Sequence, residues 1–216
     1  MATFSMVARC SRTGALGVCV STAVPAVGGV VPHAEADVGA IATQGYTEVQ
    51  YGLKGLILLR RGVHPRKALE RLLKTDPKRE MRQVIMIDKL GRKAAYTGME
   101  THEWRGHIMG EDYVAAGNLI VSEKVLEAMA YAFESSEGRL SDRLMLALEA
   151  GEEAGGDRRG GVSAALIVVG ERGLPETRPI ISLRVDFHRE PVKELRRIYD
   201  AYMKWLEMWR RSPPGL

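Results

Sequence analysis

Apolar and small polar residues alternate through the first 22 residues of the chain, and this period-two pattern is typical of β-strands. It predicts one strand over Thr3–Cys10 and a second over Ala15–Thr22. The turn-forming residues Ser11 to Gly14 separate the two strands, so the chain is expected to open with a β-hairpin. A third strand is predicted over Asp37–Gln44, where small residues leave room for close approach to the backbone.

After this strand the apolar spacing changes from two residues to three and four, which indicates helices. Val49, Leu53 and Leu56 follow this spacing and predict a helix over Glu48–Arg61, and Pro65 begins a second helix that runs to Thr75. The remaining expected elements are a hairpin of Arg82–Asp88 and Lys93–Thr97, an extended segment at Tyr113–Asn118, helices over Ser122–Glu134 and Leu140–Glu152, strands over Ser163–Val169 and Ile180–Asp186, and a helix from Pro191 to about Arg211.

The order of these elements favours an α+β fold. Two antiparallel hairpins are each followed by a pair of helices, and stacking the two sheets with helices outside covers every apolar sheet face. We therefore expect a four-layer αββα sandwich of two mainly antiparallel sheets. No internal repeat or linker divides the chain, so residues 1–216 are expected to form one domain, with 191–211 as its C-terminal helix.

Composition adds few constraints. The chain has 216 residues, 45% of them hydrophobic and 27% charged, which suits a folded domain that needs no disulfide or metal for stability. Its two cysteines, Cys10 and Cys19, fit no zinc pattern, and the predicted hairpin places Cys19 opposite Met6, so no disulfide is expected. No apolar run reaches membrane-spanning length and no signal peptide is visible, so a cytoplasmic protein without a membrane partner is expected.

The charge pattern argues against a nucleic-acid partner. The formal net charge is +4, but the 31 basic residues are interleaved with 27 acidic ones, and aromatic residues make up only 6%.

Motifs for cofactors fail on their spacing. His102 and His107 lie five residues apart, not the four that suit zinc on one helix face, and the loop Gly155–Gly161 lacks the Gly-Lys-Ser/Thr of a phosphate loop. We expect no metal and no cofactor.

The predicted C-terminal helix has a wide apolar face. Val192, Leu195 and Tyr199 begin one apolar stripe, and Trp205 and Met208 belong to a second stripe beside it. One stripe is enough to pack on a sheet, so the second indicates a contact between subunits of a homo-oligomer. The alternative is that the helix lies in a groove of its own chain.

Four blocks of the sequence resemble a widespread family: TFSMVAR at the start, AVPAVGGVVPHAEADVGAIATQGYTEVQYGLKGLILL, AAGN at Ala115–Asn118, and EAGEEAGGDRRGGVSAAL. The chain is identified as a member of domain-of-unknown-function family 1028, whose members resemble N-terminal-nucleophile (Ntn) hydrolases in fold. The resemblance runs from Thr3 to about Arg197. It implies an enzyme that cleaves an amide bond in a small amide or peptide.

The resemblance also implies roles for particular residues. In an Ntn hydrolase the first residue of the mature chain supplies the nucleophile and its own α-amine serves as the base. This suggests Thr3 as nucleophile, with Ser5 on the same strand face. The other implied groups are Ser21 and Asp157 to orient the amine, His33 for positive charge or proton transfer, Gln44 beside the oxyanion, and Asn118 and Arg158 toward the substrate. Each of these residues also has an ordinary structural interpretation, as a strand hydroxyl, a turn residue or a paired charge.

Two features depart from the family pattern. Met1 and Ala2 precede Thr3, so removal of the initiator methionine would expose Ala2, which has no nucleophile. Gly161 and Val162 stand where the family's loop typically has a basic residue and Gln. These departures keep open an alternative function: a non-catalytic ligand-binding or assembly protein on the same fold.

Overall fold

The structure, a computed structural model, describes residues 3–171 and 180–211, and within them the chain forms two antiparallel sheets and five α-helices. The strands are β1 (Thr3–Arg9), β2 (Leu16–Thr22), β3 (Pro32–Glu35), β4 (Gly39–Gly45), β5 (Arg82–Asp88), β6 (Lys93–Thr97), β7 (Gly106–Met109), β8 (Tyr113–Asn118), β9 (Ser163–Val169) and β10 (Ile180–Val185). The helices are α1 (Gln50–Arg60), α2 (Pro65–Lys74), α3 (Lys124–Ser135), α4 (Leu140–Glu153) and α5 (Pro191–Arg211).

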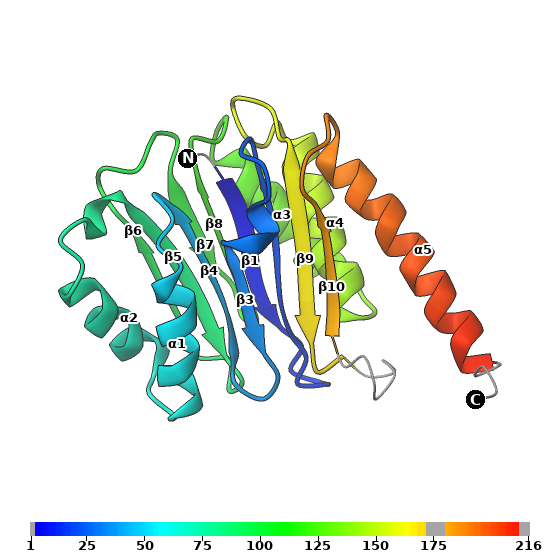
Figure 1. The fold of residues 1–216 in the computed structure, drawn as a ribbon, viewed down its shortest axis with the longest axis horizontal. Coiled ribbons are helices and arrows are strands. Elements are labelled where there is room, and N and C mark those ends of the chain that lie inside the picture. The colour runs from blue at the N-terminus through cyan, green and yellow to red at the C-terminus, as the bar shows by residue number, and fades with distance from the viewer. Residues whose placement is uncertain (1–2, 172–179, 212–216) are drawn as a thin grey trace.

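The ten strands divide into two sheets of different size. The larger has the order β10-β9-β2-β1-β8-β7, and the smaller has the order β3-β4-β5-β6. Helices α1 and α2 lie beside the smaller sheet, whereas α3 and α4 lie on the far side of the larger one (Figure 1). The α+β class expected from the sequence is therefore confirmed.

Three apolar clusters follow from the alternation of side chains along the strands. Val7, Val18 and Ile85 belong to a cluster that both sheets contribute to. Phe4, on the opposite face of β1, packs with residues of α3, α4 and α5. Ile41 of β4 belongs to a third cluster with residues of α1 and α2. One cluster thus combines residues of the two sheets, and the other two combine residues of a sheet with residues of helices.

The opening hairpin forms as predicted, but two parts of the chain differ from expectation. Met6 pairs with Cys19 across β1 and β2, and both cysteines are free. Pro32–Glu35, for which the sequence analysis predicts no strand, forms the edge strand β3 because the chain reverses direction before Gly39 and pairs with itself. The stretch around His107, for which the sequence analysis also predicts no strand, contains β7, which pairs with β8 at the edge of the larger sheet.

Helix α5 packs on the larger sheet chiefly through its first apolar stripe. Val192, Leu195 and Tyr199 are buried in the cluster of that sheet, whereas Trp205 is 39% exposed and Met208 is 62% exposed. Figure 1 shows the helix diverging from β10 toward its C-terminal end. The C-terminal part of the second apolar stripe expected from the sequence, Trp205 and Met208, is therefore exposed on this chain. No helix among the described residues is both long and apolar enough to cross a membrane.

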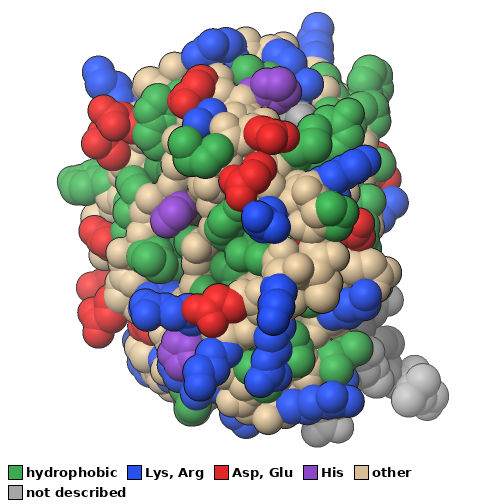
Figure 2. All heavy atoms as spheres, turned by 90° about the vertical axis from the view of Figure 1, so that its left-hand side faces the viewer, with side chains coloured by type: hydrophobic (Ala, Val, Ile, Leu, Met, Phe, Trp, Pro, Cys, Tyr) green, Lys and Arg blue, Asp and Glu red, His purple; other side chains and the backbone are tan. Residues whose placement is uncertain are grey.

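Basic and acidic side chains are interspersed over the face of the molecule that includes α1, α2 and β6 (Figure 2). Several of them form ion pairs, among them Arg60 with Glu35 and Arg82 with Asp76.

Candidate functional site

Polar side chains replace apolar ones at one end of the layer between the two sheets. Along β1, Val7 belongs to the apolar cluster shared by the sheets, while Ser5 and Thr3 continue the same face toward the chain start. Gln44 and Gln83 occupy the equivalent positions on β4 and β5 and are fully buried. A buried polar group must be hydrogen-bonded to be tolerated, so these residues depend on one another.

Two glutamine side chains connect the sheets at this end. Ser5 Oγ donates to Gln44 Oε1 at 2.7 Å, and Gln44 Nε2 donates to Gln83 Oε1 at 2.7 Å. Asn118 Nδ2, from β8, donates to the same Gln83 oxygen at 2.9 Å. Gln44 Nε2 also lies 3.4 Å from the carbonyl oxygen of Thr3 and 3.3 Å from that of Ala116. We call Ser5, Gln44, Gln83 and Asn118 the amide cluster.

Gln83 extends the amide cluster toward the surface. Its Nε2 donates to the carbonyl oxygens of Gly117 at 2.9 Å and Gly106 at 3.0 Å, and to Thr97 Oγ1 at 3.0 Å. Thr97 Oγ1 in turn lies 3.0 Å from His107 Nδ1. Burial lowers the pKa of His107 below its usual value, which favours the neutral ring. The neutral Nδ1 can then accept the Thr97 hydroxyl proton.

These contacts give Gln44 a different role from the one implied by the family resemblance, which places it beside the oxyanion. The two hydrogens of its Nε2 already serve acceptors on Gln83, Thr3 and Ala116, so none is free for an oxyanion. The carbonyl oxygen of an amide is also a poor base, so the Ser5–Gln44 bond holds Ser5 without activating it as a nucleophile. The amide cluster is therefore a support for β1.

Thr3 lies at the edge of this cluster and is 3% exposed. Its Oγ1 donates to Thr22 Oγ1 at 3.2 Å, and its strand neighbour on the other side is Asn118 of β8. Asn118 Oδ1 is buried and has no hydrogen-bond partner within the described part of the chain. Two hydroxyls and a carboxamide oxygen thus gather where β1 begins and β2 and β8 end.

Asp157 is held at the same end of the larger sheet. Its carboxylate is fully buried, and its Oδ2 accepts from the backbone N–H of Ala23, the residue after Thr22, at 2.8 Å. Arg159 forms a salt bridge with it at 3.1 Å. Asp157 also pairs with Ile120 in an isolated β-bridge, and this bridge holds the glycine-rich loop beside the end of β8. The loop therefore brings a buried acid next to the end of β2.

Three residues expected at the site lie elsewhere. His33 is on β3 opposite Ile41, and its ring packs on Gly52 of α1, so it occupies the outer face of the smaller sheet. Ser21 pairs with Phe4 and therefore faces the helices, on the other side of the larger sheet from Thr3 and Thr22. Arg158 is exposed and contacts Leu119 only through its backbone N–H. Strand alternation is the reason in the first two cases.

Sequence reasoning missed Gln83. It lies at a position that alternates with Ile85 and Ile87 in a strand otherwise apolar on that face, and a lone amide among inward-facing residues was the available signal. It also missed the direct contact of Thr22 with Thr3, since Ser21 and Thr22 are neighbours in sequence but point to opposite faces of the sheet.

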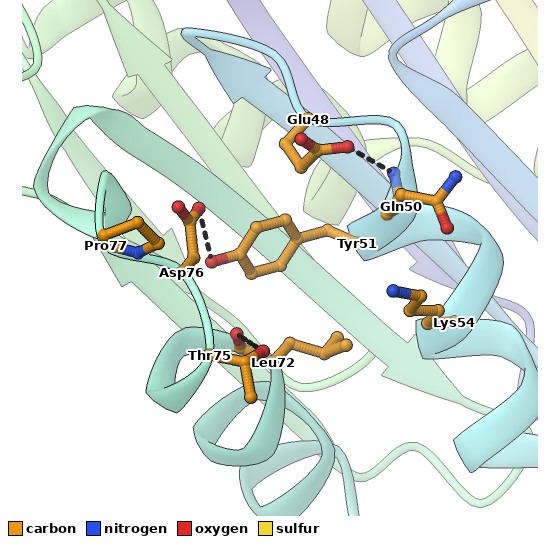
Figure 3. Close-up of a pocket in the computed structure, with 8 residues that line it drawn as sticks. All are labelled: Glu48, Gln50, Tyr51, Lys54, Leu72, Thr75, Asp76 and Pro77. Atoms are coloured by element: carbon orange, nitrogen blue, oxygen red, sulfur yellow. Dashed lines mark hydrogen bonds between the residues drawn. The ribbon is translucent and has the colours of Figure 1, made fainter.

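A separate cavity of about 270 Å³ opens between α1 and α2 (Figure 3). Tyr51 crosses it and donates to Asp76 Oδ2 at 3.0 Å, and Arg82 Nε contacts the same oxygen at 2.8 Å. Burial and the Asp76 carboxylate raise the pKa of the Tyr51 hydroxyl, so it remains a donor. This polar triad is fully paired, and it stabilises the junction of the two helices with β5.

No group of three or more His, Cys, Asp and Glu side chains among the described residues is placed to hold a metal ion. The side chains gathered at the polar end of the inter-sheet layer carry hydroxyl and amide groups, with the Asp157 carboxylate beside the end of β2. A hydroxyl needs a base to become a nucleophile, and the base available to Thr3 is its own α-amine, provided that Thr3 is the first residue.

Comparisons with known proteins show the family of this chain. A family model described as a family of unknown function, DUF1028, matches residues 3–195. The crystal structure of a protein of that family from Silicibacter pomeroyi is 35% identical, with a TM-score of 0.85, and the match covers 93% of this chain and 86% of that one. The ancestral beta-subunit Anbu from Yersinia bercovieri is 10% identical over 99% of both chains, with a TM-score of only 0.40. No curated protein matches the chain. The chain belongs to the DUF1028 family.

Proposed function

We propose that this chain is an Ntn-type hydrolase, built as a four-layer αββα sandwich, that cleaves an amide bond in a small amide or peptide with Thr3 as nucleophile. The observation that supports this most is the position of Thr3. Its hydroxyl bonds Thr22 Oγ1 at 3.2 Å, at the end of the sheet where Asp157 is anchored to the backbone of Ala23. The proposal requires removal of Met1 and Ala2, so that the α-amine of Thr3 is free.

The reaction then has a complete path for its protons. The α-amine, with an ordinary pKa of about 7.7–8.0, accepts the Thr3 hydroxyl proton as Oγ1 attacks the amide carbonyl carbon. The resulting ammonium donates this proton to the leaving nitrogen as the C–N bond breaks, leaving an ester on Thr3. Water adds to the ester by the same route in reverse and releases a carboxylic acid. Asp157, which is salt-bridged to Arg159, holds the Ala23 N–H and so fixes the end of β2 at which Thr22 contacts Thr3.

The amide cluster supports this role by fixing β1 without competing for the chemistry. Ser5 bonds Gln44, and Gln44 bonds the carbonyl oxygen of Thr3, so the first residues of the strand are held from the opposite sheet. Placing a nucleophile on a rigid strand keeps it aligned with its substrate, and this alignment contributes strongly to the rate. Asn118 Oδ1, beside Thr3 at the end of β8, is buried and has no hydrogen-bond partner among the described residues, and we assign it as the acceptor nearest the substrate.

The test is an amide-hydrolysis assay with short peptide and simple amide p-nitroanilides. If Thr3 is the nucleophile, Thr3→Ala loses at least about a thousandfold in rate, as loss of a catalytic nucleophile does in other hydrolases, whereas Thr3→Ser retains turnover. Ser5→Ala is the matched control, since it removes a hydroxyl two residues along the same face. Equal loss in Thr3→Ala and Ser5→Ala would contradict the assignment.

A second candidate function is a non-catalytic ligand-binding or assembly protein. The observation in its favour is the burial of the two candidate hydroxyl groups, since Thr3 is 3% exposed and Ser5 is fully buried. A substrate has little access to hydroxyl groups in such positions. A wild-type protein that retains Ala2 and hydrolyses none of the amides favours this candidate.

A further inference from the structure

An arginine lies in line with Thr3 and Asn118 at the polar end of the inter-sheet layer. Thr3 pairs with Asn118 of β8, and Gly117, the residue before Asn118, pairs with Gly106 of β7. Continuing this register by one residue places Arg105 beside Asn118. Neighbouring strands are about 4.8 Å apart, so about 10 Å separates the backbones of Arg105 and Thr3, with Asn118 between them.

The Arg105 side chain is directed toward the smaller sheet. His107, two residues along, contacts Thr97 of β6 through its ring, and side chains two residues apart in a strand share a face. Arg105 Nη1 donates to the carbonyl oxygen of Thr101 at 2.7 Å. Thr101 packs against the end of β4, because a Cβ atom built on Gly45 would lie 3.2 Å from its methyl carbon. The guanidinium group is therefore held at the end of the layer where the amide cluster lies.

The contacts of this guanidinium group are confined to one of its three nitrogen atoms. Nη1 contacts the Thr101 carbonyl oxygen and, at 3.0 Å, a carboxylate oxygen of Glu103. Among the described residues, Arg105 Nε and Nη2 have no hydrogen-bond partner. These two nitrogens form one edge of the group, and their parallel N–H donors match the two oxygens of a carboxylate.

Two other arginines of the chain use this same edge to bind a carboxylate. Arg159 donates from Nε and Nη2 to the two oxygens of Asp157 at 3.2 and 3.1 Å, and Arg196 does so to Glu149 at 2.6 Å. The Arg105 side chain is only 18% exposed, less than the 39% of Arg159 and the 25% of Arg196. Its one acidic partner, Glu103, is 67% exposed, and an ion pair with so exposed a group is weak. The edge of Arg105 is therefore suited to a carboxylate from outside the chain.

Asn118 adds a hydrogen-bond acceptor between Thr3 and Arg105. Its Oδ1 is buried and has no partner within the described part of the chain, so a ligand N–H at this position would offset its desolvation cost. The order across the sheet is thus a hydroxyl, an acceptor and a cation. An N-acylated amino acid has groups that match this order, namely its carbonyl carbon, its amide N–H and its carboxylate.

We propose that Arg105 binds the carboxylate of the substrate through Nε and Nη2, and that the substrate is an N-acyl amino acid or a short peptide cleaved before its C-terminal residue. This inference rests on the proposed function, since it takes Thr3 as the group that attacks the carbonyl carbon. The substrate N–H donates to Asn118 Oδ1. Water is the co-reactant, the C–N bond breaks, and the products are a carboxylic acid and a free amino acid.

The first experiment measures binding apart from hydrolysis. Thr3→Ala protein is titrated calorimetrically with N-acetylalanine and with N-acetylalaninamide, in which a neutral amide replaces the carboxylate. We expect N-acetylalanine to bind about tenfold or more tightly, because hydrogen bonds to charged groups contribute factors of that size. Adding Arg105→Gln should reduce the difference to within about twofold. Arg105→Lys, which keeps the charge but lacks the two-nitrogen edge, should retain part of it.

Arg9→Gln, also made in Thr3→Ala protein, is the matched control. The Arg9 side chain is 20% exposed, close to the value for Arg105, and it lies at the opposite end of β1 from Thr3. It should leave both affinities within about twofold. Circular dichroism shows whether each variant is folded, and Arg105→Lys serves if Arg105→Gln does not fold. The assignment is overturned if Thr3→Ala protein binds the acid and the amide equally or not at all, or if Arg9→Gln removes the preference as Arg105→Gln does.

Hydrolysis of the same two compounds by the wild-type protein separates this inference from the proposed function. Release of alanine, followed by its amino group, should exceed release of alaninamide by about tenfold or more in kcat/KM. Preferential binding of N-acetylalanine without any release would contradict the hydrolase and leave the role of Arg105 standing. Equal kcat/KM for the two compounds would support the hydrolase and overturn the role of Arg105.

Discussion

Ser5 and Gln44 are hydrogen-bonded across the two sheets, with Ser5 Oγ 2.7 Å from Gln44 Oε1. Through this bond the first strand of the larger sheet is attached to an inner strand of the smaller one. Both residues are fully buried, and Gln83 continues the connection to β7 and β8. The polar end of the inter-sheet layer is thus joined by specific hydrogen bonds, whereas the rest of the layer is joined by apolar packing.

Gln83→Met is expected to destabilise the protein strongly. The substitution keeps the side chain's length but removes an acceptor used by Gln44 and Asn118 and a donor used by two backbone carbonyls. Leaving buried groups unpaired costs about 1–3 kcal/mol each, so we expect a loss of about 3 kcal/mol or more in the free energy of unfolding by urea denaturation. The control Gln50→Met, at an exposed glutamine, should change the free energy of unfolding by no more than about 0.5 kcal/mol.

Gly52→Ala is expected to destabilise the packing of α1 on the smaller sheet. A Cβ atom at Gly52 would lie 2.3 Å from the ring of His33, so the ring or the helix must move. Overpacking of this kind typically costs about 1–3 kcal/mol. The double variant His33→Ala/Gly52→Ala should recover part of the loss, and purely additive effects in this cycle would contradict the contact.

The stability should fall as the pH is lowered through the histidine range. Burial lowers the pKa of His33 and of His107, so the folded protein binds fewer protons than the unfolded chain. The stability is therefore constant above the unfolded pKa of about 6.5 and declines below it, toward the folded-state values. Urea denaturation at several pH values measures this decline, and it should be shallower in His33→Gln. An identical pH profile in that variant would be the contrary result.

Self-association is expected to involve the exposed end of α5. Trp205 and Met208 present apolar surface there, at 39% and 62% exposure, while the other stripe of the helix is buried. Sedimentation analysis should show an oligomer for the wild type and a smaller species for Trp205→Glu/Met208→Glu. Leu90→Glu, which alters another exposed apolar residue, is the control and should leave the mass unchanged. A monomeric wild type would exclude this interface.

The sequence predicted the elements more completely than the site, for a physical reason. Apolar periodicity reports which face of a strand is buried, and it identified the opening hairpin with Met6 opposite Cys19. It does not report which buried face meets the other sheet and which meets helices. His33 and Ser21, which the family resemblance associates with Thr3, each lie on a helix-facing side.

The short edge strands could not be predicted from the hydrophobic periodicity either. The four-residue strands β3 and β7 are too short to show a period, and their pairing depends on partners fixed by the fold. Gln83 could have been found as a polar residue among inward-facing apolar ones, but its partners come from four different strands. Asp157 was identified from its glycine-rich loop, and the structure places it beside the end of β2.

The most direct test of the proposed nucleophile is peptide mapping by mass spectrometry after treatment of the purified protein with a β-lactone, which acylates activated hydroxyl groups. The account predicts an N-terminal peptide that begins at Thr3 and carries one acyl group as an ester on Thr3 Oγ1. A peptide that still begins with Met1 or Ala2, with no acyl group on Thr3, would contradict it.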